Sequence, residues 1–265
     1  MVQKQLLAAT FPIHYTISGA GEAVVLLHGF GQDGAIWQSL KVVLEKQYKV
    51  IIPDLPGTGN SESDITGITM ETLAENIKLL LDKEQITLCS MIGHSMGGYI
   101  SLAFAERYGH HLQRLGLFSS MAYADSDQKK EGRKKTIDFL SRHGTAMYLQ
   151  QSVPKLFSPE SNENNPAQIR EIIQRYSNLS SASLVHYTEA MMNRPDRTAV
   201  LEHFAGPVLF IFGEQDTAIP IDQSLRQSHL PEISYIYIGT HSGHMGMLEE
   251  TGFCIDAVTY FLSGK

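Results

Sequence analysis

Short apolar segments rich in β-branched residues alternate along this chain with longer segments of helical periodicity, and this alternation limits the fold more than any other feature. Most of these segments are continuously apolar, which is typical of parallel strands covered on both faces. Parallel strands need helical crossovers, so the order predicts an α/β protein with a mostly parallel sheet. The predicted strands cover residues 23–29, 48–54, 86–95, 114–120, 207–213 and 234–239, and segments near 4–9 and 13–18 predict a hairpin at the sheet edge.

The alternation stops between residues 122 and 203, where helical patterns occur without a convincing strand. A polar segment at 158–167, rich in proline and asparagine, predicts a loop within this stretch. We therefore expect an α/β core formed by residues 1–121 and 204–265, with residues 122–203 inserted as a helical cap. The predicted helices cover residues 35–47, 70–83 and 97–109 in the core and 129–157, 165–179 and 181–194 in the cap.

Composition and charge exclude several functional classes. Hydrophobic residues make up 43% of the 265 residues, enough for a sizeable core, and the formal net charge of −7 argues against a nucleic-acid partner. No segment reaches the roughly 18 apolar residues of a membrane span, and the N-terminus lacks a signal-peptide pattern. Cys89 and Cys254 lie in apolar patterns and predict buried thiols, so we expect a cytoplasmic protein without a membrane partner. The sequence indicates no oligomeric state.

The pentapeptide at residues 93–97, GHSMG, lies between an apolar strand pattern and a helical pattern. It fits G-x-S-x-G, the nucleophile elbow, in which a strained serine is exposed at a strand-to-helix turn. Residues two before and two after the serine crowd one another there, which explains Gly93 and Gly97. The motif predicts Ser95 as a nucleophile, and the alternative is a small-residue turn without chemistry.

A nucleophilic serine needs a base, and the base needs an orienting acid. Asp216 follows the strand 207–213, and His244 follows the last strand, so both are expected at the same sheet edge as Ser95. Their order, Ser, Asp, His, is that of the elbow-containing hydrolases. Competing acids and a competing base also follow strands: Glu214, Asp125 and His241. His241 and His244 form an H-x-x-H pair, but no third metal ligand at an evident spacing accompanies them.

An acyl-transfer site also needs donors for the oxyanion that develops on the substrate. The backbone N–H of Met96, directly after the nucleophile, is one expected donor. The second is the N–H of Phe30, because HGFG at residues 28–31 forms a loop after an earlier strand. Gly29 and Gly31 would let this loop approach the substrate.

The order of these motifs resembles the α/β-hydrolase superfamily over nearly the whole chain, and most of all its serine esterase and enol-lactonase-like members. This resemblance implies an eight-stranded sheet flanked by helices, with a helical cap between the sixth strand and the acid-bearing strand. A serine at position 95 differs from haloalkane dehalogenases and epoxide hydrolases, which have aspartate there. The matching segments are HGFG at 28–31, DLPGTGNS at 54–61, GHSMGG at 93–98, FGEQD at 212–216 and SGH at 242–244.

We therefore expect a carboxylesterase-like serine hydrolase that cleaves small to medium esters or lactones through an acyl-enzyme, without a metal or organic cofactor. Carbon–carbon bond hydrolysis, lyase chemistry and perhydrolysis with the same triad are alternatives, as is a non-catalytic ligand-binding protein on the same fold. The basic segment KKEGRKK at 129–135 is either a solvated helix face or a means of attracting an anionic substrate. The expected pocket residues are Trp37, Met121, Tyr123, Tyr148, Leu156, Phe157, Met191, Met192 and Met245; the alternative is that they pack cap helices on the sheet.

Overall fold

A single eight-stranded sheet organises the protein in the computed structural model, which describes residues 2–7, 10–61 and 64–264. The strand order is β1-β2-β4-β3-β5-β6-β7-β8; β2 is antiparallel to β1 and β4, and all other neighbours are parallel. The predicted edge hairpin is β1 and β2, although residues 8 and 9 lie outside the described part of the chain. The strands are β1 Val2–Leu6, β2 Ile13–Ser18, β3 Ala23–Leu27, β4 Lys49–Asp54, β5 Cys89–His94, β6 Leu112–Phe118, β7 Val208–Gly213 and β8 Ser234–Gly239.

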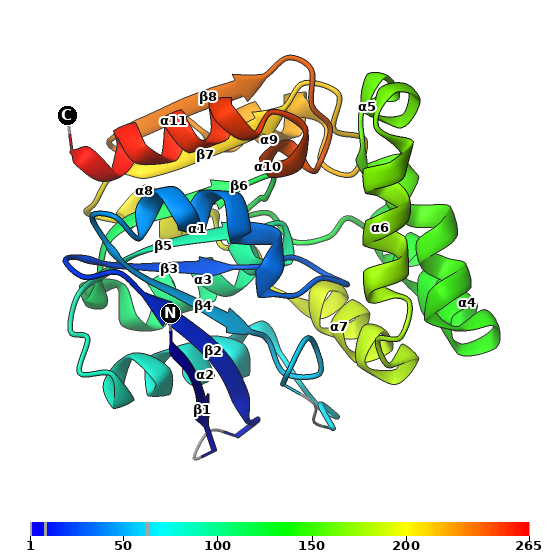
Figure 1. Ribbon diagram of the computed structural model, residues 1–265, viewed down its shortest axis with the longest axis horizontal. Coiled ribbons are helices and arrows are strands. Elements are labelled where there is room, and N and C mark those ends of the chain that lie inside the picture. The colour runs from blue at the N-terminus through cyan, green and yellow to red at the C-terminus, as the bar shows by residue number, and fades with distance from the viewer. Residues whose placement is uncertain (1, 8–9, 62–63, 265) are drawn as a thin grey trace.

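Helices cover both faces of the sheet (Figure 1). Because successive strand residues point to opposite faces, a continuously apolar strand supplies two cores. In β3, Val25 and Leu27 join the hydrophobic cluster on the side of α2 and α3, whereas Val24 and Leu26 join the cluster on the side of α1 and α11. The core helices are α1 Gln38–Leu44, α2 Met70–Lys83, α3 Met96–Tyr108, α8 Thr198–His203, α9 Ile221–Gln227, α10 Gly246–Glu249 and α11 Thr251–Ser263, with short 3-10 helices η1 Gly34–Trp37 and η2 Gly109–His111.

The helices α4 to α7 gather beside the end of the sheet to which the parallel strands point (Figure 1). We call these four helices, together with η3, the cap. Helix α8 belongs elsewhere, because it packs against α3. The cap elements are α4 Asp127–Ser152, η3 Val153–Leu156, α5 Pro159–Asn164, α6 Pro166–Tyr176 and α7 Ser181–Asn193.

The polar segment 158–167 is not the predicted loop, because it contains α5 and the start of α6. Ser158 caps α5 by accepting a hydrogen bond from the Ser161 N–H, and Pro159 occupies its first turn. Both residues favour a helix N-terminus, and local capping therefore outweighs the low helix propensity of the asparagines.

Candidate active site

Ser95 stands between β5 and α3 in a strained backbone conformation, with φ 51° and ψ −114°. A β-carbon on Gly93 would collide with the backbone of Gly97, and one on Gly97 would collide with the carbonyl oxygen of Leu27. Gly93 is therefore needed for the tight turn, and Gly97 is needed because α3 starts close to the end of β3. The Ser95 side chain is only half buried and lies on the wall of a cavity.

The neighbouring strand β6 holds this turn from below. The Ser95 N–H donates a 2.9 Å hydrogen bond to the carbonyl oxygen of Phe118, and the Ser120 hydroxyl donates a 2.8 Å bond to the carbonyl oxygen of Ser95. Two hydrogen bonds thus offset part of the backbone strain, which costs about 1–3 kcal/mol at such positions. Nothing in the sequence around Ser120 distinguishes it from other loop serines, so its contribution required the tertiary structure.

Asp216 and His244 meet at the carboxyl ends of β7 and β8. The distance from His244 Nδ1 to Asp216 Oδ2 is 2.7 Å, and both side chains are buried. The other carboxylate oxygen accepts hydrogen bonds from the N–H groups of Ala218 and Ile219, at 2.8 and 2.9 Å. The Asp216 carboxylate is therefore oriented by its own loop, which we call the acid loop, and it faces the His244 imidazole. This is the arrangement that orients a histidine base and stabilises its charged form.

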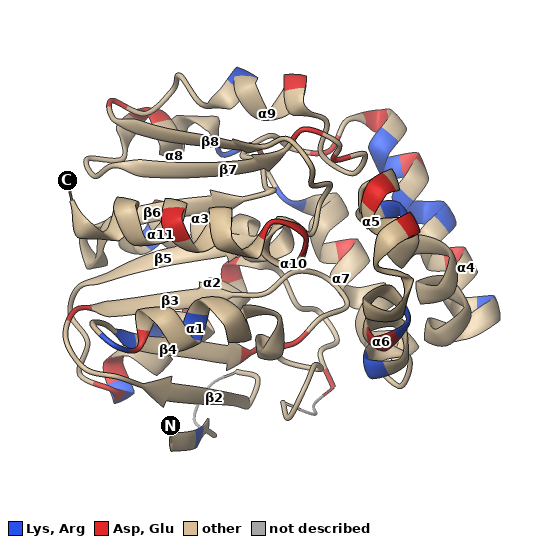
Figure 2. Ribbon diagram, turned by 45° about the horizontal axis from the view of Figure 1, so that its top comes forward, with Lys and Arg blue, Asp and Glu red and all other residues tan. Residues whose placement is uncertain are grey.

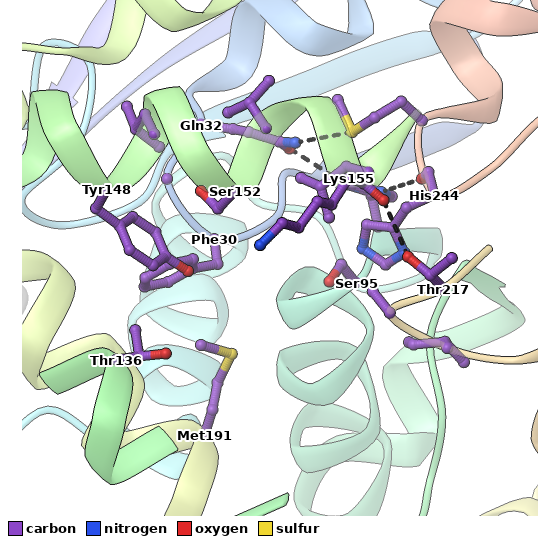
Figure 3. Close-up of a pocket in the computed structure, with 18 of the residues that line it drawn as sticks. Phe30, Gln32, Ser95, Thr136, Tyr148, Ser152, Lys155, Met191, Thr217 and His244 are labelled. Carbon is purple, nitrogen blue, oxygen red and sulfur yellow. Dashed lines mark hydrogen bonds between the residues drawn. The ribbon is translucent and has the colours of Figure 1, made fainter. Parts of the chain in front are cut away.

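Ser95 and His244 line the same cavity, and Figure 3 shows their side chains next to each other. The Ser95 hydroxyl donates no hydrogen bond to another residue in the described part of the chain. In many hydrolases the hydrogen bond between nucleophile and base is long without substrate and tightens only when substrate binds.

The loop that carries His244 is held by Glu249 and by the cap. Glu249 Oε1 accepts hydrogen bonds from the N–H groups of Gly243 and Met245, at 3.0 and 3.2 Å, while Oε2 accepts a 2.7 Å bond from Ser158 N–H at the start of α5. One carboxylate thus joins the His244 loop, which we call the base loop after the predicted role of His244, to the cap. The sequence analysis missed this role, and no motif in the sequence indicates it.

The competing candidates lie elsewhere. Glu214 is exposed, and His241 is a surface residue whose Nδ1 lies 3.2 Å from Glu160. Asp125 is buried in ion pairs with Arg133 and Arg194, at 2.9 and 2.7 Å. No group of three or more His, Cys, Asp or Glu side chains within the described ranges could hold a metal ion.

Phe30 lies on the cavity wall, and Met96 is the first residue of α3, where backbone N–H groups lack partners within the helix. Neither amide donates a hydrogen bond to another described residue. The Phe30 ring packs edge-on against Tyr148 of the cap, with the ring centroids 6.2 Å apart. Both amides are therefore free to donate to a ligand beside Ser95.

The cavity has a volume of about 670 Å³ and lies between the sheet edge and the cap. Of the expected pocket residues, Tyr148, Leu156, Met191 and Met245 line it. For the other expected pocket residues the prediction was wrong, because their side chains pack elsewhere in the protein and do not face the cavity. Those that do not line the cavity are Trp37, Met121, Tyr123, Phe157 and Met192.

Several of these side chains miss the cavity because they are part of the hydrophobic core. Trp37 is fully buried and packs edge-on against Phe118 and the His94 ring. Met121 and Phe157 belong to the two hydrophobic clusters that flank the sheet. Met192 follows Met191 on α7, and one residue step of about 100° turns neighbouring side chains to different faces.

His94, directly before Ser95, is buried and forms part of the cavity wall. Its Nε2 lies 3.0 Å from the carbonyl oxygen of His244, to which it donates, and its Nδ1 lies 3.2 Å from Gln32 Oε1. Burial, and then the nearby His244, keep the pKa of His94 well below the ordinary histidine value of about 6.5. His94 is therefore a neutral support for the base loop.

The family of the chain follows from a sequence model that describes the alpha/beta hydrolase fold and matches residues 22–251. The chain belongs to this family. The match begins just before β3 and ends at the start of α11, so it includes the elbow, the acid loop and the base loop. The expected eight-stranded α/β-hydrolase fold is confirmed.

Several similar proteins are hydrolases or esterases. The 2-hydroxy-6-oxo-2,4-heptadienoate hydrolase of Pseudomonas putida is 26% identical over 93% of this chain and 91% of its own. A thermophilic esterase from Thermogutta terrifontis, solved with malate bound, is 26% identical, with a TM-score of 0.93 over 100% of this chain and 99% of its own. The enol-lactonase from Burkholderia xenovorans shares the fold at 22% identity, with a TM-score of 0.90 over 98% and 100% of the two chains. The chain is therefore a hydrolase of this family. Among the described helices, none is both long and apolar enough to cross a membrane.

Proposed function

We propose that this hydrolase cleaves carboxylic esters or lactones of small to medium molecules through an acyl-enzyme on Ser95. The observation that carries the proposal is the 2.7 Å contact between His244 and Asp216 at the wall of the cavity that Ser95 lines. The similarity to an esterase at 26% identity over the whole chain supports the same reaction class.

In the proposed mechanism, the Ser95 oxygen attacks the carbonyl carbon of the ester while His244 accepts the hydroxyl proton. Asp216 stabilises the resulting imidazolium, and the Phe30 and Met96 amides donate hydrogen bonds to the oxyanion. The tetrahedral intermediate collapses, the C–O bond breaks, and His244 returns the proton to the leaving alcohol. A water molecule then repeats the sequence on the acyl-enzyme and releases the acid. The cap would select the substrate.

An activity-based probe tests this proposal. A fluorophosphonate should phosphonylate Ser95, and mass spectrometry of the digested protein should find the adduct on the peptide that contains it. Ser95→Ala should abolish both the adduct and the turnover of p-nitrophenyl esters. Esterase turnover that survives in Ser95→Ala would contradict the proposal. If the wild-type protein showed neither labelling nor ester turnover, a non-catalytic binding protein would be favoured.

Carbon–carbon bond hydrolysis by the same residues is a second candidate. It is favoured by the similarity to 2-hydroxy-6-oxo-2,4-heptadienoate hydrolase, which extends over nearly both chains. Parallel assays of simple p-nitrophenyl esters and vinylogous diketones should separate the two reactions. A kcat/KM at least tenfold higher for esters is expected, and the reverse ratio would favour the second candidate.

A further inference from the structure

The cavity beside Ser95 has a basic wall in an acidic protein. Its lining includes three basic side chains, from Lys129, Arg133 and Lys155, and no Asp or Glu among the described residues, although the chain carries a net charge of −7. Lys129 and Arg133 come from the start of α4, and Lys155 comes from η3. Figure 2 shows the basic residues gathered along α4.

Helical geometry divides the basic segment 129–135 into two faces. Residues three and four apart lie on the same side of a helix, and Lys129, Arg133 and Thr136 all line the cavity. Lys134 lies on the other side, where it is exposed and pairs with Glu131 at 2.6 Å. The segment is therefore both a solvated face and a cavity wall.

The cavity-facing cations are only partly neutralised. Arg133 donates through Nε to Asp125, but Asp125 also pairs with Arg194, so one carboxylate serves two guanidinium groups. Among the residues that the structure describes, the Lys129 ammonium has one hydrogen bond, a long one of 3.5 Å to the carbonyl oxygen of Ala218. The Lys155 ammonium pairs with no carboxylate in the described ranges, and Figure 3 shows its side chain extending into the cavity toward the space between Phe30 and Ser95.

These cations affect the pKa of Tyr99, which lines the same cavity. Tyr99 is buried, and burial alone would raise the pKa of its phenol. The positive charges of Arg194, Lys129 and Arg133 outweigh burial and lower the pKa of Tyr99 below its ordinary value. Two of these three cations, Lys129 and Arg133, also line the cavity, so their positive charge acts on a bound ligand as well.

We propose that the enzyme selects substrates that carry a carboxylate remote from the scissile bond, such as monoesters of dicarboxylic acids, and that Lys155 and Lys129 bind this carboxylate at the cap side of the cavity. The inference rests on the proposed ester hydrolysis and names its substrate class. The apolar wall formed by Tyr148, Leu149 and Met191 would contact the chain between the carboxylate and the ester.

Matched esters test the selection. One pair consists of the p-nitrophenyl monoester of adipic acid and the ester in which an isopropyl group replaces the terminal carboxylate. In a second pair, the carboxylate or the isopropyl group is carried by the alcohol part of the ester instead of the acyl part. In at least one pair, kcat/KM should be about tenfold or more higher for the ester that carries the carboxylate. A difference of this size corresponds to one charge-assisted hydrogen bond. This preference should shrink in about 1 M salt, where the Debye length is about 3 Å.

Variants locate the binding group. Lys155→Gln and Lys129→Gln should each lower the carboxylate-to-isopropyl ratio of kcat/KM, together by at least tenfold, whereas Lys134→Gln on the opposite face of α4 should leave the ratio unchanged. A wild-type ratio near or below one in both pairs would overturn the proposal, and so would equal ratios in the Lys155→Gln, Lys129→Gln and Lys134→Gln variants.

Direct binding separates this inference from the reaction itself. Titration calorimetry of Ser95→Ala should detect adipate but not its neutral diamide, and Lys155→Gln added to that variant should weaken adipate binding about tenfold. If adipate binds in this way but the wild type neither hydrolyses esters nor reacts with the phosphonate, the proposed function fails while the carboxylate site stands. Equal or absent binding of adipate and diamide overturns the site.

Discussion

The backbone N–H of His244 donates a 2.7 Å hydrogen bond to the carbonyl oxygen of Leu156, which joins the base loop to η3 of the cap. One residue earlier in η3, the carbonyl oxygen of Lys155 accepts a 3.0 Å bond from the Thr217 hydroxyl of the acid loop. The same turn of the cap therefore contacts the loops of both Asp216 and His244. Movement of η3 should alter the geometry of the site as well as its access.

Gly243 tests this connection. A β-carbon at this position would lie 2.8 Å from the Leu156 carbonyl oxygen, so Gly243→Ala must displace η3 or the base loop. We expect kcat/KM for a p-nitrophenyl ester to fall about tenfold or more while the protein stays folded by circular dichroism, since small misplacements of catalytic groups are costly. Gly252→Ala in α11 is the control, because no atom lies within 4 Å of its added carbon. Equal activity of both variants would argue against the connection.

Because the backbone at Ser95 is strained, we expect its replacement by glycine to increase stability and abolish activity. Glycine adopts φ 51° and ψ −114° at lower cost than serine, so Ser95→Gly should raise the free energy of unfolding by about 1 kcal/mol while abolishing turnover. Ser95→Ala keeps a β-carbon and should lose activity without this gain. Urea denaturation of the three proteins measures the difference, and a Ser95→Gly protein no more stable than Ser95→Ala would show that the turn is not strained.

The Asp216 carboxylate should be essential as an acceptor. In Asp216→Asn, the remaining oxygen can still accept from the Ala218 and Ile219 amides, but the side-chain NH2 group would face His244 Nδ1 and favour the wrong tautomer. A fall in kcat of about 10⁴ is expected from such a change in a serine triad. The exposed Glu214 provides the control through Glu214→Gln. Comparable losses in the two variants would return Glu214 to consideration as the acid.

Buried histidines should make stability depend on pH. Burial lowers the pKa of His94 far below the value of about 6.5 that it has in an unfolded chain. Between these two values the unfolded state binds a proton that the folded state does not, so stability is complete above about pH 6.5 and is lost as the pH falls. Burial also lowers the pKa of His28, so His94 supplies only part of the effect.

The His94→Gln variant isolates this part. The slope of unfolding free energy against pH between about pH 5 and 6.5 should become less steep by up to about 1.4 kcal/mol per pH unit, the limit for one proton. His110→Gln, at an exposed position, should leave the slope as it is in the wild type. Equal slopes in all three proteins would mean that folding does not change the protonation of His94 in this pH range.

Local sequence determined the sheet and the elbow. Continuous apolar segments predicted β3 to β7, because a parallel strand inside the sheet is covered on both faces and carries few polar residues. The segment of β8 is also apolar, although this strand lies at the sheet edge and is partly exposed. Gly93 was predictable because its β-carbon would meet the backbone of Gly97, four residues away, whereas the need for Gly97 comes from the carbonyl oxygen of Leu27 in β3 and depends on the tertiary structure. The same locality explains how the acid and base loops could be located from the strands that precede them.

Tertiary structure alone decided what surrounds these residues. Glu249 accepts three hydrogen bonds from backbone N–H groups, and Ser120 donates one to a backbone carbonyl oxygen; such contacts with the backbone leave no sequence pattern. Trp37 and Phe157 were expected in the pocket because hydrophobic composition does not distinguish a cavity wall from a core, and only packing assigns a side to each. The charge of the cavity likewise arises from Lys129, Arg133 and Lys155, which are separated in the sequence and line one cavity with Ser95 only in the folded chain.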